Sequence, residues 1–599
     1  MPRAAVLPIK RNALAVCLSG ALVTAPSAGV ARSGSLQAHA QASDAVFVSS
    51  CADDGGPDTL RAAVSSAASG DTVDLTQLTC ATITLNSGQI EVHVDDLTID
   101  GPGAGALAID GNYNGRVFHH DGVGTLALSA LTITHGVASS ADLNPDNIRA
   151  AYGGCILSDH GSNSTGVSFY GSVSLTDVML VDCQAIAVPQ GIAYFVASGG
   201  GVHAQADLTV VRSTISGNRA SSANFRALGG GLYSHYGTIS LTDSNVVNNR
   251  VEAFYPIVAY VPNSAGGGGL ATYHGVSISG SVIAHNFAGC DSQTQLCRSA
   301  LGGGMRVSGA LEISTSAIYD NTAEAQGSLQ DATANGAGCY SVYGDIHITD
   351  STISNNHLLG NATERRGGGL FTAGGFAPDE DVVIAGSTLD NNSADKGGGL
   401  FDKAGKLNII DSTISGNSAD TAGGGVYALG SAYGAHPWKL SNSTVTANSA
   451  GNGGGIVDNH DPDLGPTELQ SSIVADNIND LTGTTYDADL GSVYSGVTIA
   501  GANNLIVAAN GIVLPSDTLS ADPLLGPLQD NGGPTRTHAL LPGSPAIDAG
   551  NNAANVDFDQ RGSGFARVVG ASADIGAFEV QVNDVIFGDG FDTGGGDPP

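Results

Sequence analysis

Apolar and polar residues alternate with a period of two along most of the chain, in short runs separated by Gly, Asn and Asp-Ser pairs. The runs are rich in Thr, Ile, Val and Ser. In one of them Leu407 and Ile409 are expected to point inward, while Asn408 and Ile410 point outward. Short β-branched runs with this period are typical of β-strands, whereas an amphipathic helix has apolar residues three and four positions apart. The pattern predicts an all-β protein and excludes helical repeats.

Two short signatures recur between about residues 150 and 480. The first is Gly-Gly-Gly followed by an apolar residue, with copies at 199–202, 229–232, 267–270, 302–305, 367–370, 397–400, 423–426 and 453–456, and degenerate copies at 153–155 and 336–339. The second runs apolar-x-apolar-x-Asp-Ser-Thr-Ile-Ser-x-Asn, and its closing asparagines are Asn218, Asn249, Asn286, Asn321, Asn356, Asn392, Asn417, Asn448 and Asn477. They recur about every 32 residues, which is a solenoid repeat length. We therefore predict a single-stranded parallel β-helix of roughly a dozen coils, one for each repeat.

Stacking of equivalent strands about 4.8 Å apart explains both signatures. Asparagines at one corner of every coil can hydrogen-bond to one another through their side-chain amides, and asparagine tolerates the left-handed backbone of a turn. We interpret this column as a structural ladder and not as a binding site. Three glycines allow coils to approach closely at another corner. Phosphate binding by the glycines is excluded, because no Gly-x-x-x-x-Gly-Lys-Ser/Thr pattern is present.

Composition narrows the class of protein. Glycine accounts for 85 of 599 residues, yet the aliphatic content is high enough to bury a core, which excludes a disordered Gly/Ser tract. Asp and Glu number 56 against 22 Lys and Arg, and the resulting net charge of −34 argues against nucleic acid as a partner. No cofactor is identified. The acid excess leaves Ca²⁺ binding open, although no Asp-x-Asp-x-Asp-Gly loop is present.

Residues 1–40 have the layout of a secretory signal peptide. Basic residues precede an acid-free, weakly apolar run at 12–31, and small-residue cleavage sites lie between 28 and 40. This run is too interrupted to span a membrane, and no later segment is apolar over about 18 residues. We expect an exported protein without a transmembrane segment. After the signal we expect an N-terminal cap with the first coils (41–136), β-helix repeats (137–519), a C-terminal region (520–580) and a flexible tail (581–599).

Seven cysteines remain once Cys17 is assigned to the signal peptide. Residues 59–68 have the apolar spacing of a short helix that could cover the first coil. Cys51 and Cys80 flank this helix, so we expect a disulfide that fastens the cap. The next plausible pairs are Cys155 with Cys183 and Cys290 with Cys297. Cys339 is then left over, as a buried small apolar residue at a glycine corner.

Both ends of the chain carry motifs outside the repeats. The N-terminal segments 49–64, 70–73, 97–103 and 131–134 resemble the cap of bacterial β-helix proteins that includes the CSLREA domain, although Cys51 does not directly precede Thr59-Leu60-Arg61. The C-terminal segments are 522–535, 538–550, Asp559-Gln560-Arg561-Gly562 and Asp574-Ile575-Gly576-Ala577-Phe578-Glu579, and they resemble the choice-of-anchor Q family. This resemblance implies a bacterial surface-associated β-helix, and the rule for parallel crossovers makes it right-handed.

The chain departs from the well-known anchoring signals. The chain has no Leu-Pro-x-Thr-Gly motif, no Pro-Glu-Pro motif with a membrane helix and no C-terminal β-barrel pattern. Residues 584–592 are similar to a short terminal motif of some exported proteobacterial proteins, so we consider them a sorting signal.

A column of side chains directly follows the apolar residue of the glycine signature. If Leu370 and Leu400 face inward, the period of two places four aromatic residues outward on consecutive coils: Tyr340, Phe371, Phe401 and Tyr427. An exposed aromatic strip suits stacking on sugar rings, and the alternative is a core stack or a strip covered by a loop. Histidines that follow the glycine corners, including His203 and His235, form no regular column, and we interpret them as exposed loop residues.

These features predict an exported adhesion module that binds an extracellular polysaccharide or another host or cell-surface polymer. The first alternative is a polysaccharide lyase or glycoside hydrolase, since such enzymes share the fold. No catalytic motif is recognisable, however, and Arg365-Arg366 is the main basic pair among the coils. The second alternative is a purely structural surface rod. We assign no catalytic and no metal-ligating residue.

Overall fold

The computed structural model describes residues 44–582, apart from 140–148, 163–167, 189–194, 224, 255–262, 291–296, 327–331, 375–379, 405, 430–437, 482–486, 495 and 510. The predicted signal peptide and the predicted sorting motif at 584–592 lie outside the described residues. Ser43–Pro599 forms one compact unit, separate from Met1–Ala42.

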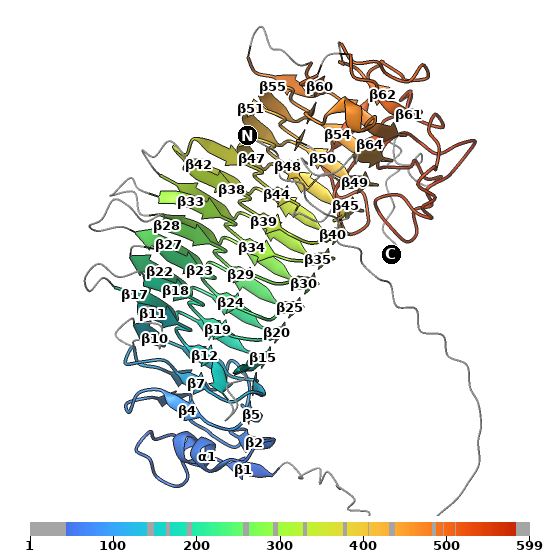
Figure 1. The fold of residues 1–599 in the computed structure, drawn as a ribbon. Helices are drawn as coiled ribbons and strands as arrows, with labels where there is room; N and C mark the ends of the chain where they lie inside the picture. The colour runs from blue at the N-terminus through green and yellow to red at the C-terminus, as the bar shows by residue number, and fades with distance from the viewer. Residues whose placement is uncertain are drawn as a thin grey trace, which may run out of the picture. The chain divides into compact units, whose positions relative to one another are not determined.

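The chain folds as a right-handed parallel β-helix, which confirms the predicted fold class. Nearly every strand pairs in parallel with the equivalent strand of the next coil, and the coils stack from the N-terminal to the C-terminal end of the unit (Figure 1). Three sheets form the body of the helix. Sheet I has 15 strands, from β1 (Ala45–Phe47) to β61 (Ala500–Ala502), sheet II has 14, from β3 (Thr82–Thr84) to β62 (Leu505–Ile506), and sheet III has 13, from β4 (Ile90–Val92) to β60 (Leu490–Ser492).

One coil illustrates the path of the chain. It begins with β20 (Leu208–Val211) in sheet I and continues with β21 (Thr214–Ser216) in sheet II. The chain then leaves the body along β22 (Arg219–Ala223), returns along β23 (Arg226–Leu228), and enters sheet III as β24 (Leu232–Ser234) after the glycine triplet. Inward residues such as Leu208, Ile215 and Leu232 form one continuous core along the helix.

The outgoing and returning strands of successive coils form a two-layered projection, which we call the fin. The fin ends where one strand takes the place of an outgoing and a returning strand. This strand, β47 (Ser393–Lys396), pairs through its first residue with β42 (His357–Gly360) and through its last residue with β43 (Glu364–Arg366). The two layers of the fin enclose a second core made mainly of alanine, distinct from the core of the body. Alanine suits this position because it fills little space between closely packed layers. The sequence analysis did not predict the fin.

The asparagine column is a buried hydrogen-bonded ladder. The Asn321 side chain donates from Nδ2 to Asn356 Oδ1 (3.0 Å) and accepts at Oδ1 from Asn286 Nδ2 (3.0 Å). The same bonding joins all nine asparagines, and Asn477 ends the series by donating to Asp489 Oδ1 (2.9 Å). A serine ladder at the turn between sheets I and II repeats in the same way, as where Ser351 N donates to Ser387 Oγ (3.1 Å). Ordered polar ladders satisfy backbone groups at turns that would otherwise be buried without partners.

The glycine triplet and the asparagine ladder face each other. A Cβ placed on the third glycine of a triplet would contact an asparagine of the ladder, as with Gly231 and Asn249 Cγ (3.1 Å) or Gly399 and Asn417 Cγ (3.1 Å). The first glycine of each triplet has a positive φ, for example +63° at Gly397. These contacts explain why the two sequence signatures recur together.

The N-terminal end is closed by the predicted helix, observed as α1 (Leu60–Ser66) with Thr59 as its N-cap. Leu60, Ala63 and Val64 are buried against the core of the first coils. Disulfides join Cys51 to Cys80 beside this helix and Cys155 to Cys183 in a later coil. Cys290 is also disulfide-bonded, and the side chain of its predicted partner Cys297 lies outside the described residues. Among the described residues Cys339 is free and buried, and burial raises the pKa of its thiol.

The C-terminal region does not continue the stack. It contains the hairpin of β63 (Leu525–Gln529) and β64 (Thr537–Leu540), and it lies beside sheet II of the last coils, where Figure 1 shows it in orange and red. Thr388 Oγ1 donates to the Arg536 carbonyl (2.7 Å), and Ser415 Oγ bonds to His538 Nε2 (2.8 Å). The region therefore covers a flank of the helix, while Ile512 and Leu514, just before it, pack against the core at its end.

Candidate functional site

The predicted exposed aromatic strip is not exposed. Tyr340, Phe371, Phe401 and Tyr427 do project from the outer face of sheet III, since their neighbours Leu370 and Leu400 belong to the core. Their rings stack on one another with centroids 5.1, 5.5 and 5.2 Å apart. Phe371 is only 5% exposed and Phe401 only 2%. The prediction of a free stacking surface at these four residues was therefore wrong.

The base of the fin covers this aromatic stack. The Arg366 guanidinium lies 5.4 Å from the Phe401 ring centroid, and Lys396 Nζ lies 5.7 Å from that of Tyr427. Val342 and Ala422 pack against the rings from the sides. Burial of large aromatic side chains, with cations over their faces, stabilises the packing of the fin against the body. The stack is thus a structural element, and Arg366 belongs to it.

A second aromatic group beside sheet III reaches the surface. Only its buried members lie on strands of that sheet, and the others lie in turns that follow its strands, in the fin or in a separate hairpin. We call it the tyrosine–histidine cluster, and its members are Tyr152, Tyr170, His203, Tyr233, His235, Tyr236 and Tyr273. His203 and Tyr233 are buried at its base, whereas Tyr236 is 49% exposed. His235 stacks on Tyr236 with ring centroids 4.1 Å apart, and Tyr236 stacks on Tyr170 at 4.5 Å. The cluster therefore offers a partly exposed edge of stacked rings, whose buried base lies on sheet III.

Burial determines the charge state of the two histidines of the cluster. Burial lowers the pKa of His203 to about 3, and Ser198 Oγ bonds to its Nδ1 (2.8 Å). Burial, together with His274, also lowers the pKa of His235. Both imidazoles are therefore neutral near neutral pH. Two arginines hold Tyr273. Arg226, from the fin, donates from Nη1 to its hydroxyl (3.4 Å), and the guanidinium of Arg306, from sheet III, lies 5.1 Å from its ring centroid.

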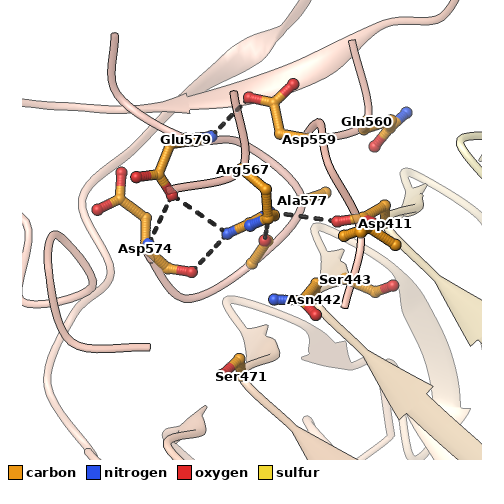
Figure 2. Close-up of polar contacts among 12 residues, drawn as sticks. Asp411, Asn442, Ser443, Ser471, Asp559, Gln560, Arg567, Asp574, Ala577 and Glu579 are labelled. Carbon is orange, nitrogen blue, oxygen red and sulfur yellow. Dashed lines mark hydrogen bonds and ion pairs between the residues drawn. The ribbon is translucent and has the colours of Figure 1, made fainter. Parts of the chain in front are cut away.

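The C-terminal motifs build a buried polar cluster rather than an open site (Figure 2). Arg567 Nη1 donates to Asp411 Oδ1 (3.2 Å) and to the Gly576 carbonyl (2.9 Å), and its Nη2 donates to the Asp574 carbonyl (2.6 Å). Arg561 Nη2 pairs with Asp559 Oδ2 at 2.7 Å, and both side chains are fully buried.

Burial raises the pKa of Asp411 and that of Glu579 to about 7 each. Such shifts are common at catalytic sites, but structural ion-pair networks also produce them. Because the side chains of this cluster hold the C-terminal region against sheet II and are buried, we assign them a structural role.

Two further properties concern only the described part of the chain. Within it, no three His, Cys, Asp or Glu side chains are grouped so that they could hold a metal ion. No helix in that part is both long enough and apolar enough to cross a membrane.

Comparisons with known proteins give no assignment: neither a family model nor a curated protein matches the chain. The resemblance of the two ends to the CSLREA and choice-of-anchor Q segments therefore stays a prediction.

The tyrosine–histidine cluster was not predicted as a unit. The histidines that follow the glycine corners were expected to be exposed loop residues, whereas His203 is buried. Two signals could have located the cluster. His203 and Tyr233 occupy the same column as Phe371, and Tyr236 directly follows His235. The remaining contact, between Tyr170 and Tyr236, depends on the antiparallel hairpin of β13 (His160–Ser162) and β14 (Ser168–Tyr170), which interrupts the repeat.

Proposed function

We propose that the protein is an extracellular, surface or secreted β-helix that binds a carbohydrate polymer at the tyrosine–histidine cluster. The single observation that carries the proposal is the exposed, ordered edge formed by Tyr236 on Tyr170 and His235. Exposed rings that are held in place by stacking on one another suit contact with the C–H faces of sugars, while tyrosine hydroxyls and imidazole nitrogens suit the hydroxyl groups. The neutral state of His235 favours stacking, because an uncharged ring is less strongly hydrated.

The disulfides support the location. Cys51–Cys80 and Cys155–Cys183 are typical of proteins that fold in an oxidising, extracellular compartment. Export through the predicted signal peptide and attachment through the C-terminal region are part of the same proposal. The docking of that region on sheet II would leave the tyrosine–histidine cluster, beside sheet III, accessible.

A purely structural rod is the second candidate, and one observation favours it. The asparagine and serine ladders reinforce the helix from about residue 213 to residue 477, and the buried aromatic stack reinforces the coils between 340 and 427. A polysaccharide lyase or glycoside hydrolase would in addition require an acid or base at an open site, and the carboxyls with strongly raised pKa, Asp411 and Glu579, are buried.

The test is retention of the purified protein on a panel of insoluble polysaccharides, with and without Ca²⁺. The variants are Tyr236→Ala and, as a matched control, Tyr343→Ala, which removes a tyrosine that is 57% exposed and lies outside the cluster. We expect the wild type and Tyr343→Ala to be retained by at least one polysaccharide, and Tyr236→Ala to be retained roughly tenfold less, as for the loss of a stacking contact. Equal retention of both variants, or none of the wild type, would favour the rod. Release of reducing or unsaturated ends would favour the enzyme.

A further inference from the structure

The outer face of the fin carries a cleft of about 430 Å³ that is unrelated to the tyrosine–histidine cluster. Its strands are β22, β27 (Arg250–Phe254), β32 (Phe287–Cys290) and β37 (Thr322–Ala325). Glu252, Gly289 and Glu324 occupy equivalent positions on three successive coils. Gly289 lacks a side chain between the two glutamates, and a Cβ there would lie 2.5 Å from the Phe287 ring. The missing side chain therefore leaves room for the Phe287 ring, which lines the cleft. The volume of the cleft suits a small ligand.

Arg250 is held in one orientation inside this cleft. Its Nε donates to Glu252 Oε1, and its guanidinium lies over the Phe287 ring, 3.8 Å from the ring centroid. These two contacts use one edge and one face of the guanidinium. Its Nη1–Nη2 edge has no hydrogen-bond partner among the described residues, although the side chain lines the cleft. That edge is the one that binds a carboxylate through two parallel hydrogen bonds.

Arg219 reinforces this arrangement from the neighbouring coil. Its Nε donates to Glu252 Oε2 (2.7 Å), and its Nη2 donates to the same oxygen. One partly buried carboxylate, 14% exposed, therefore orients two guanidinium groups that are 43% and 47% exposed. The three side chains together carry one positive charge in a protein of net charge −34. An anionic group is the complement of this local excess.

The far side of the cleft has different chemistry. Glu324 accepts at Oε1 from Gln326 Nε2, so that its carboxylate is oriented but not neutralised. A carboxylate and an amide at this place bind hydroxyl groups and repel a second anion. A ligand that fits both sides has one carboxylate with hydroxyl groups close to it.

We propose that this cleft binds a uronate unit, that is, a sugar that carries a carboxylate. The carboxylate pairs with the Nη1–Nη2 edge of Arg250, and the sugar hydroxyls bond to Glu324 and Gln326. The site is separate from the one in the proposed function and does not depend on it. An acidic peptide is the rival ligand, and it is the weaker fit because it offers no sugar hydroxyl groups to Glu324 and Gln326.

The experiment is calorimetric titration of the full mature chain with three probes: trigalacturonate, the neutral trisaccharide maltotriose, and triglutamate. The variants are Arg250→Gln, Arg250→Lys, which keeps the charge without the bidentate edge, and Arg212→Gln as the control. Arg212 is equally exposed, pairs with Asp177 (2.7 Å) and lies outside the cleft. Thermal unfolding of each variant shows whether the fold is retained.

We expect trigalacturonate to bind and the two other probes not to. Arg250→Gln should weaken binding roughly tenfold or more, Arg250→Lys by less, and Arg212→Gln not at all. Equal binding of maltotriose, tighter binding of triglutamate, or unchanged affinity in a folded Arg250→Gln would overturn the proposal. Because Tyr236→Ala leaves this cleft intact, failure here and failure of the proposed function are distinguishable.

Discussion

Cys155 and Cys183 form a disulfide at the position where later coils hold a glycine and an asparagine. Cys183 is in register with Asn218 and donates its backbone N–H to Asn218 Oδ1 (3.0 Å). Cys155 is the third residue of a degenerate glycine triplet, in the place of Gly201. The covalent bond thus begins the ladder that the asparagines continue.

This replacement predicts a rescue. In the double variant Cys155→Gly with Cys183→Asn, the introduced amide can donate to Asn218 Oδ1 and extend the ladder by one coil. We expect the double alanine variant of the same pair to lose about 3 kcal/mol of unfolding free energy, and the Gly/Asn variant to regain about 1 kcal/mol of it. Denaturant unfolding of the three proteins measures the difference. A Gly/Asn variant no more stable than the alanine variant would contradict the equivalence of the two pairs.

The third glycine of each triplet faces the asparagine ladder, so a larger side chain at this position should lower the free energy of unfolding strongly. Gly399→Ala places a Cβ 2.7 Å from the Gly425 carbonyl oxygen and 3.1 Å from Asn417 Cγ, and the backbone oxygen has no room to move. We expect a loss of about 2 kcal/mol or more. Gly105→Ala is the control, because no atom lies within 4 Å of its added Cβ, and it should change stability by less than about 0.5 kcal/mol. Similar losses for both would show that the close approach is not real.

The buried aromatic stack predicts an effect on stability and not on binding. Phe401→Ala removes a ring that stacks on both Phe371 and Tyr427. We expect a loss of about 3 to 5 kcal/mol, as for a buried phenylalanine, with polysaccharide retention unchanged in the protein that remains folded. Thermal unfolding and retention measured on the same preparations separate the two. Loss of retention at full stability would restore the stack as a binding surface.

The buried polar cluster predicts a pH dependence of stability. The pKa values of Asp411 and Glu579, about 7 in the folded protein, lie well above their ordinary values of 3.8 and 4.5. The folded state therefore holds more protons than the unfolded state between about pH 4 and pH 7. The contribution of these two groups to the free energy of unfolding is fully present below their ordinary pKa values. It is lost as the pH rises through about 7, by at most about 1.4 kcal/mol per pH unit for each group.

The matched variants for this dependence are Asp411→Asn and Asp243→Asn. Both positions have a positive φ at the same turn, and Asn442 already occupies that turn in the coil after Asp411, so asparagine fits the backbone. Asp243 is exposed. Thermal unfolding between about pH 5 and pH 8 should show a shallower pH slope for Asp411→Asn and the wild-type slope for Asp243→Asn. Identical slopes in all three proteins would contradict the assignment.

The repeated columns made the body of the helix predictable. Asn218 and its equivalents recur with the spacing of the coils, and the Leu407–Ile410 alternation shows which side chains enter the core. The burial of Phe371 and Phe401 was not predictable in this way. It depends on the fin, whose strands vary in length between the asparagine and the glycine triplet, and whose only sequence signal is alternating alanine, as at Ala185 and Ala187.

The position of the C-terminal region could also not be predicted from the sequence. Its contacts join residues such as Arg567 and Asp411, which are 156 positions apart, and no local pattern identifies the sheet on which it docks. One signal exists in retrospect. The outward positions of sheet II change from exposed residues such as Met179 and Asn245 to small buried ones such as Thr413 and Thr444.

Hydroxyl-radical footprinting is the decisive test of carbohydrate binding at the tyrosine–histidine cluster, because it reports the exposure of individual tyrosine side chains. The protein is oxidised with and without a soluble form of the polysaccharide that retains it. The account predicts that the ligand lowers the oxidation of Tyr236 and Tyr170 and leaves that of Tyr343 unchanged. Unchanged oxidation of Tyr236, or protection of Tyr343 alone, would contradict it.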